Sequence, residues 1–274
     1  MKVPLQHYCS AHRYNLQVSE FKSDLVVKLQ GRAAPSKGGG HRSEITELTR
    51  ASIRRLKFRL RNGETEWKTL VTLTYPAVFP TDGRKVKKHL NAFLQWLRRQ
   101  EGRYCWALEF QRRHAPHIHI IIDRYLDIDE AKERWWHIVG SGDEDHRGQG
   151  VQVDAIRGTG EDRARVVGYL ISYLKKADQK TVPAAFEHVG RFWGGSRDVI
   201  VEVCRVALRA TEGEARRALR IVRKWYERKM KSWGFTWYWR RQQGFVMWGG
   251  AEIWDKLLSS GQINFKEVVH VRHS

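Results

Sequence analysis

Three residues on two adjoining segments have the types and spacing of a metal site. His117 and His119 are separated by one residue, in the sequence Pro-His-Ile-His-Ile-Ile-Ile. Side chains alternate between the faces of a strand, so both imidazoles share one face if this segment is extended. Glu109 lies near the end of the preceding apolar segment, and a hairpin brings it across from the pair. Two imidazoles and a carboxylate with open coordination positions suit a catalytic divalent metal ion.

The third ligand of this site has two candidates, Glu109 and Gln111. Both have the same strand parity, and the carboxylate is the better ligand for a hard divalent ion. His114 lies in the turn between the two segments, where a phosphate contact or solvent exposure is expected. A His-x-His pair considered alone is equally compatible with an ordinary half-exposed strand, because histidine is intermediate in burial.

A second group of residues has the types needed for nucleophilic chemistry. Tyr169 and Tyr173 are four positions apart in a segment with helical apolar spacing, 164–176, so they lie on one helix face. Lys176 follows one turn later. A phenol with a pKa near ~10 needs a nearby cation or base to attack at neutral pH, and the lysine supplies a cation. An isolated tyrosine pair of this spacing more often packs at the edge of a core.

The elements that position these groups are predicted from periodicity and turn residues. Leu-Thr alternation predicts a strand over 67–75, and helical spacing predicts a helix from Arg84, with Lys87 on its polar side. The metal candidates lie on strands over 104–110 and 117–123. Other predicted elements are strands at 25–29, 151–156 and 199–203, helices at 43–55, from 127 to 138 and at 251–254, a loop at 143–145, a turn at 191–194 and a hairpin at 234–249.

Composition and charge restrict the class of protein. The chain has 274 residues, a formal charge of +20 and a pI near 10.1, which favours a polyanionic partner such as nucleic acid. Three separated cysteines without a CxxC pair indicate neither a disulfide framework nor a zinc knuckle. No apolar run is long enough to span a membrane, and the N-terminus lacks the apolar core of a signal peptide, so a cytoplasmic location is expected.

The C-terminal part is strongly basic and rich in tryptophan. Between residues 214 and 241 arginine and lysine far outnumber glutamate, and four tryptophans are interleaved. Such a segment suits contact with a nucleic-acid backbone and bases, although a helix with one apolar face and solvated charges explains it equally well. The expected division of the chain is an N-terminal extension with a basic Gly-rich loop (1–55), a catalytic domain (56–207) and a basic, Trp-rich region with a possible role in DNA binding (208–274).

The order of these motifs resembles the HUH endonucleases, and within them the rolling-circle replication initiators (Rep proteins) of plasmids and single-stranded DNA phages. The resemblance covers 67–193. It rests on Thr72-Leu73-Thr74-Tyr75, on Pro116-His117-Ile118-His119 with Glu109 before it, and on Tyr169-Leu170-Ile171-Ser172-Tyr173-Leu174-Lys175-Lys176. Many two-tyrosine relatives have lysine directly before the second tyrosine, where this chain has Ser172. The Tyr-x-x-Lys spacing of Tyr173 and Lys176 is retained.

The resemblance implies an α+β fold of the RRM-like or ferredoxin-like kind, with the histidine strand in the middle of an antiparallel sheet flanked by helices. It implies Mg²⁺ or Mn²⁺ on His117, His119 and Glu109. It also implies cleavage of a single-stranded DNA origin by Tyr173, with Tyr169 as its partner, through a 5′-phosphotyrosine intermediate. Because the covalent link conserves the bond energy, no nucleotide cofactor is expected. The sequence has no GxxxxGK[ST] motif, so a host helicase is an expected partner.

Three alternative functions remain on the sequence alone. The first is an HUH transposase or relaxase, although conjugative relaxases usually place the tyrosine before the histidine motif and the transposases are usually shorter. The second is a non-catalytic origin-binding or regulatory protein on the same fold. The third is an RNA-binding sheet, which requires exposed aromatic residues on the strands that the Leu-Thr and His-Ile alternations do not supply.

Overall fold

The computed structural model describes residues 15–20, 24–30, 45–63, 65–156, 168, 182–199, 201, 205–209, 212–232, 234, 244–248 and 267–270. The chain divides into two compact units, one formed by 41–200 and the other by 1–40 together with 201–274. Each unit has its own sheet and is described by itself.

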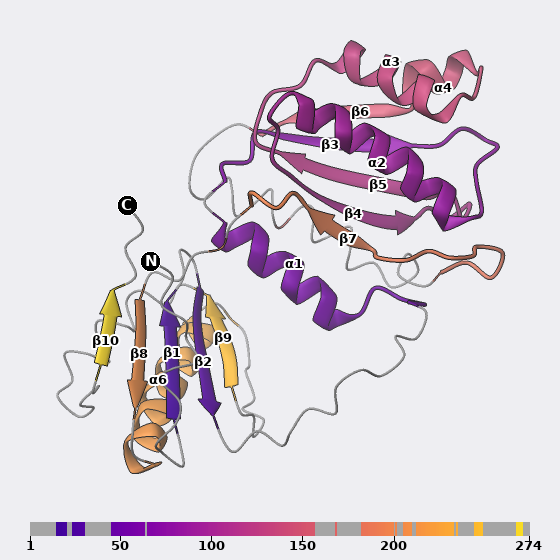
Figure 1. Ribbon diagram of the computed structural model, residues 1–274. Helices are drawn as coiled ribbons and strands as arrows, with labels where there is room; N and C mark the ends of the chain where they lie inside the picture. The colour runs from indigo at the N-terminus through magenta and orange to yellow at the C-terminus, as the bar shows by residue number, and fades with distance from the viewer. Residues whose placement is uncertain are drawn as a thin grey trace. The chain divides into compact units, whose positions relative to one another are not determined.

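The unit 41–200 is built on a five-stranded antiparallel sheet with helices against it (Figure 1), which confirms the expected α+β class. The strand order is β6-β3-β5-β4-β7, so the histidine strand β5 is central, as the resemblance implied. The strands are β3 (Thr69–Thr74), β4 (Tyr104–Phe110), β5 (Pro116–Ile122), β6 (Val151–Ala155) and β7 (Trp193–Gly195).

The register of the three central strands places the polar candidates on one face of this sheet. His117 is opposite Thr74 on β3 and Glu109 on β4. His119 is opposite Thr72 on β3. Residues directly opposite each other in antiparallel strands have side chains on the same face. The sheet therefore gathers two threonines, two histidines and one glutamate from three strands.

Helices α2 (Gly83–Arg99) and α3 (Ile128–Val139) cover the opposite face. The apolar stripe of α2 is buried as its helical spacing predicted. Trp135 of α3 is fully buried, and its ring makes T-shaped contacts with Tyr75 and Phe93. These aromatic rings bury large apolar areas and form the centre of the core.

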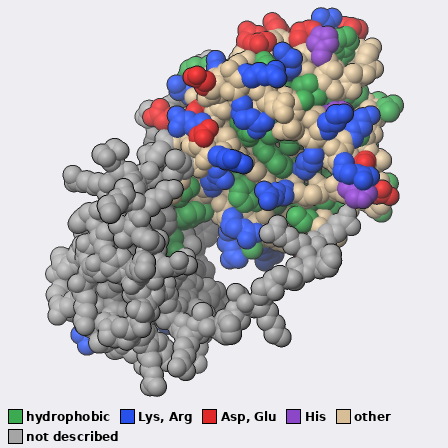
Figure 2. All heavy atoms as spheres, in the orientation of Figure 1, with side chains coloured by type: hydrophobic (Ala, Val, Ile, Leu, Met, Phe, Trp, Pro, Cys, Tyr) green, Lys and Arg blue, Asp and Glu red, His purple; other side chains and the backbone are tan. Residues whose placement is uncertain are grey.

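Lys87 differs from its expected place on the solvated side of α2. Its ammonium group lies 4.4 Å from the ring centroid of Trp106 and donates to the backbone carbonyl of Arg191. Burial lowers the pKa of Lys87 to about 7. The other Lys and Arg residues of this helix are exposed: Arg84, Lys85, Lys88, Arg98 and Arg99. Figure 2 shows Lys and Arg side chains spread over the visible face of this unit.

Helix α1 and strand β7 depart from the sequence-based prediction. Thr49 caps α1 (Arg50–Asn62), which begins and ends later than predicted. The second half of the predicted turn at 191–194 instead belongs to strand β7 (Trp193–Gly195), which pairs with β4. Two glycines follow Trp193 there, and a Cβ at Gly194 would lie 2.8 Å from the indole nitrogen of Trp106. The glycines therefore let this strand pack closely against its neighbours, which turn propensities alone do not indicate.

The acidic segment expected to be a loop instead begins helix α4 (Glu144–Gln149). The Asp143 carboxylate accepts hydrogen bonds from the backbone N–H groups of Asp145 and His146, as an N-cap residue does. Asp82 and Asp127 cap α2 and α3 in the same way. Acidic residues in a first helical turn are stabilised by the helix dipole, so the three acidic residues favour a helix start here.

The second unit joins both ends of the chain in another antiparallel sheet, with strand order β10-β8-β1-β2-β9. Its strands are β1 (Asn15–Glu20), β2 (Asp24–Gln30), β8 (Arg205–Arg209), β9 (Gly244–Trp248) and β10 (Glu267–His270). The basic helix α6 (Glu212–Ser232) belongs to this unit. Strand 25–29 and the basic helix are confirmed, while the Gly-rich loop at 31–42, most of the strand at 199–203 and the helix at 251–254 lie outside the described residues.

Within the described residues, no helix combines the length and the apolar character that crossing a membrane requires.

Candidate metal centre

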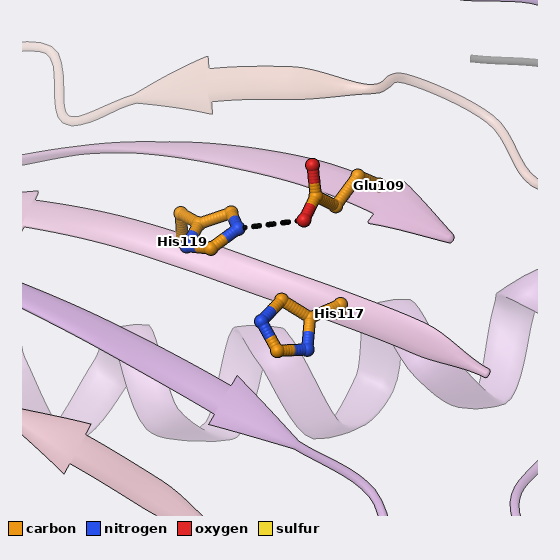
Figure 3. Close-up of side chains that lie close together, drawn as sticks. All are labelled: Glu109, His117 and His119. Carbon is orange, nitrogen blue, oxygen red and sulfur yellow. Dashed lines mark hydrogen bonds and ion pairs between the residues drawn. The ribbon is translucent and has the colours of Figure 1, made fainter. Parts of the chain in front are cut away.

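Glu109, His117 and His119 form one compact group on strands β4 and β5 (Figure 3). One ligand atom from each residue can be chosen so that all three lie within 4.8 Å of one another. The period of a strand aims both imidazoles in one direction, and the hairpin register adds the carboxylate. The sequence-predicted ligands are thus brought together, and the set of two nitrogens and a carboxylate is one that divalent metals accept.

The environment of the carboxylate fits a cation. Glu109 Oε1 lies 3.0 Å from His119 Nε2. Glu109 is only 4% exposed and His119 only 2%. The second oxygen, Oε2, is buried without a hydrogen-bond partner among the described residues. A buried carboxylate oxygen without a partner is costly, and a divalent cation between the two strands removes that cost.

The side chain of Gln111 is engaged elsewhere. Its Oε1 accepts a hydrogen bond of 2.9 Å from Arg113 Nε. Arg113 also donates to the backbone carbonyls of Tyr75 and Pro76, which ties the β4–β5 turn to the end of β3. Of the two candidate third ligands, Glu109 is therefore the one that lies with the histidines. His114 is exposed in the turn, with a φ of 67°.

Two threonine hydroxyls contact the imidazoles from β3. Thr72 Oγ1 lies 3.2 Å from Nδ1 of His119, and Thr74 Oγ1 lies 3.4 Å from Nδ1 of His117. Each threonine is the direct cross-strand neighbour of its histidine. The Leu-Thr alternation predicted a strand, and neither threonine was among the predicted site residues. Their shared parity was visible in the sequence, but the pairing depends on the register.

The backbone at the end of β3, beside the site, is held by side chains of α3 and α4. The carbonyl of Thr74 accepts hydrogen bonds from Nε1 of Trp135 at 2.8 Å and from Nε2 of His146 at 3.0 Å. His146 is buried, which lowers the pKa of its imidazole despite the carbonyl contact. Helices α3 and α4 thereby fix the end of the strand that faces His117.

The predicted nucleophilic group, Tyr169, Tyr173 and Lys176, lies outside the described residues.

A protein-family model described as a replication-associated protein of the ORF2 kind matches residues 68–178. The family match begins just before β3 and includes the whole Glu109–His117–His119 group and the segment that carries both tyrosines. It confirms the resemblance to rolling-circle replication initiators and supports a role in the initiation of replication. Comparisons with curated proteins and with solved structures gave no significant match.

Proposed function

We propose that this protein is a metal-dependent single-stranded DNA endonuclease and strand transferase that initiates rolling-circle replication. The observation that carries the proposal is the Glu109–His117–His119 group on the central strands of a segment that matches the replication-associated protein family. Mg²⁺ or Mn²⁺ is the proposed ion; such an ion supplies charge stabilisation at a scissile phosphate. Both imidazoles and the carboxylate hold it, while the buried sheet fixes their positions.

Tyr173 is the proposed nucleophile. Its phenolic oxygen forms a bond to phosphorus while the bond from phosphorus to the 3′ oxygen breaks. The phenolic proton is lost to solvent or a base, and the departing 3′ oxygen takes up a proton to give a free 3′-OH. Lys176 favours the phenolate by its charge. Tyr169, four residues before Tyr173 in the sequence, is the proposed partner that attacks a second origin while the first link is still in place.

The proposed partners are a single-stranded DNA origin and a host helicase. A formal charge of +20 favours binding of a polyanion. The absence of a P-loop motif from the sequence means that strand separation requires another protein. Strand joining needs no nucleotide cofactor, because the phosphotyrosine link retains the energy of the cleaved bond.

Formation of a covalent adduct tests this function directly. Protein is incubated with Mn²⁺ and single-stranded oligonucleotides that tile the replicon's intergenic region, and adducts are resolved on a denaturing gel. We expect an adduct that is lost on chelation of the metal and lost in Tyr173→Phe, with Tyr169→Phe retaining the first cleavage. An adduct that survives in Tyr173→Phe but disappears in Tyr169→Phe reverses the assignment of the nucleophile. Origin binding without any adduct contradicts the enzyme and supports a non-catalytic origin-binding protein.

A further inference from the structure

The two threonines of β3 meet the histidines in a repeated arrangement. Each hydroxyl is directed at Nδ1 of the histidine opposite it in the register, at 3.2 Å for Thr72 and 3.4 Å for Thr74. Nε2 of His119 faces the carboxylate of Glu109 instead. With a threonine contact at Nδ1, Nε2 is the nitrogen that each ring would present to a metal ion, and each ring has one threonine hydroxyl beside it.

A hydroxyl has a property here that a carbonyl or a carboxylate lacks. It both donates and accepts a hydrogen bond. When His119 Nε2–H donates to Glu109, Nδ1 is the acceptor and Thr72 donates. When Nε2 ligates a cation, Nδ1 carries the proton and donates a hydrogen bond to the Thr72 hydroxyl. The same threonine therefore supports the imidazole before and after ion binding. The hydrogen bond of the second ring nitrogen normally fixes the tautomer of a metal-bound histidine.

We infer that Thr72 and Thr74 are positioning residues that hold Nε2 of His119 and His117 toward the metal ion. The inference rests on the metal site of the proposed function. It adds the role of the Thr-Leu-Thr sequence, whose alternation places one hydroxyl beside each histidine. The β-branched side chains stiffen χ1, so both hydroxyls are held in place at little further entropic cost.

Valine and serine substitutions separate the hydroxyl from the shape of the side chain. Thr72→Val keeps the branched shape and removes the hydrogen bond, whereas Thr72→Ser keeps the hydroxyl. Thr69→Val is the matched control: its hydroxyl also bonds to a buried group, the carbonyl of Arg124 at 2.7 Å, but its side chain points to the other face. Mn²⁺ affinity is measured without DNA, by the electron paramagnetic resonance of the free ion, with the melting temperature recorded for every variant.

We expect Thr72→Val to weaken Mn²⁺ binding about 10–100-fold, as loss of an outer-shell partner does, and Thr72→Ser to restore most of it. Thr69→Val is expected to lower the melting temperature and leave the Mn²⁺ affinity unchanged. Unchanged affinity in Thr72→Val with Thr74→Val overturns the inference, as does equal weakening in Thr69→Val. A wild-type protein that binds no Mn²⁺ contradicts both proposals. One that shows the threonine dependence and forms no DNA adduct contradicts the proposed function alone.

A second, independent observation concerns helix α6. Arg220, Lys224, Arg228 and Lys231 are all exposed, and their spacing of four, four and three residues places them on one face. The row extends over about 16 Å at ~1.5 Å per residue. Among the described residues none of these four is in an ion pair, whereas the neighbouring Arg223 binds Glu227 at 2.7 Å.

The choice between single-stranded and double-stranded nucleic acid depends on whether aromatic side chains accompany the cations. Proteins that bind single strands combine cations with aromatic side chains on which bases stack. The tryptophan of α6 in the described part, Trp225, is buried together with Val222 on another side of the helix. A straight row of cations with no exposed tryptophan among the described residues of α6 suits the regular phosphate charges of a duplex, which recur every ~1.7 Å of its axis. We propose that this face of α6 binds the backbone of double-stranded DNA without base specificity.

The salt dependence of binding tests this surface. Affinity for a 30-base-pair duplex is measured against salt concentration for Arg220→Gln, Lys224→Gln, Arg228→Gln and Lys231→Gln combined. A charge-matched control replaces four exposed cations of the other unit, Arg54, Arg55, Lys85 and Lys88, by glutamine. We expect the slope of log K against log salt to fall by about 3 for the α6 variant, from ~0.9 for each phosphate contact. The slope of the control is expected to stay within about 1 of wild type.

Circular dichroism of the α6 variant shows whether the helix is retained. An unchanged slope with a folded helix overturns the proposal. An equal fall in the control variant does so as well, since it assigns the effect to net charge. A loss confined to single-stranded DNA or RNA also contradicts a duplex surface. Nicking of a short single-stranded oligonucleotide is expected to persist in the α6 variant, so this proposal and the proposed nuclease function fail separately.

Discussion

Replacing His117 and His119 together by alanine is expected to lower covalent adduct formation by about a thousandfold or more and to abolish Mn²⁺ binding. Lewis-acid stabilisation of a phosphoryl transition state is worth several kcal/mol, and each ~1.4 kcal/mol corresponds to a factor of ten in rate. Both imidazoles lie within 4.8 Å of each other and of Glu109. Their removal leaves one carboxylate, which is too few protein ligands to hold the ion in place.

The matched control removes two other imidazoles. His137 and His188 are exposed on the same unit, and His137→Ala with His188→Ala removes the same number of histidines. We expect this control to retain adduct formation within about threefold, because surface substitutions away from a site usually change free energies by less than ~0.5 kcal/mol. Adduct formation undiminished in the His117 and His119 variant excludes a metal role for the pair. Equal loss in the control would mean that removal of any two histidines has this effect, and that the effect is not specific to His117 and His119.

Replacing Trp135 by alanine is expected to destabilise the unit 41–200 by about 3–5 kcal/mol, the usual cost of emptying a buried aromatic site. The indole is fully buried against Tyr75 and Phe93. Its Nε1–H also donates to the carbonyl of Thr74 at 2.8 Å, beside the metal ligands. The substitution therefore removes packing from the core and one of the two side-chain donors to the Thr74 carbonyl.

The neighbouring tryptophan provides the comparison. Trp136 is half-buried, and its indole donates to the backbone carbonyl of Asp143 at 3.0 Å. We expect Trp136→Ala to cost about 1–2 kcal/mol, because it removes a partly exposed ring and one hydrogen bond. Urea unfolding followed by circular dichroism measures both variants. Equal midpoints for the two variants contradict the central position assigned to Trp135.

The order of the site residues along the chain was sufficient to predict the Glu109–His117–His119 group, which could hold a metal ion. The alternation of side chains between the two faces of a strand is a local property. The sequence His117-Ile118-His119 was therefore enough to predict that both imidazoles lie on one face. The apolar spacing of α2 was likewise local and was confirmed. The local residue types predicted a turn at 191–194, but packing against other strands decides the structure there. Trp193-Gly194-Gly195 forms a strand because its glycines pack against Trp106 and Cys105.

The choice between Glu109 and Gln111 was beyond the sequence, since the two residues have equal parity. The tertiary structure decided it because Arg113 binds the Gln111 amide oxygen, while Glu109 stays opposite His117. The pairing of Thr72 and Thr74 with the histidines depended on the register of β3 against β5, which is fixed by burial of the opposite face. The second sheet joins strands from both ends of the chain. Contacts between residues so distant in sequence depend on packing, which no local pattern encodes.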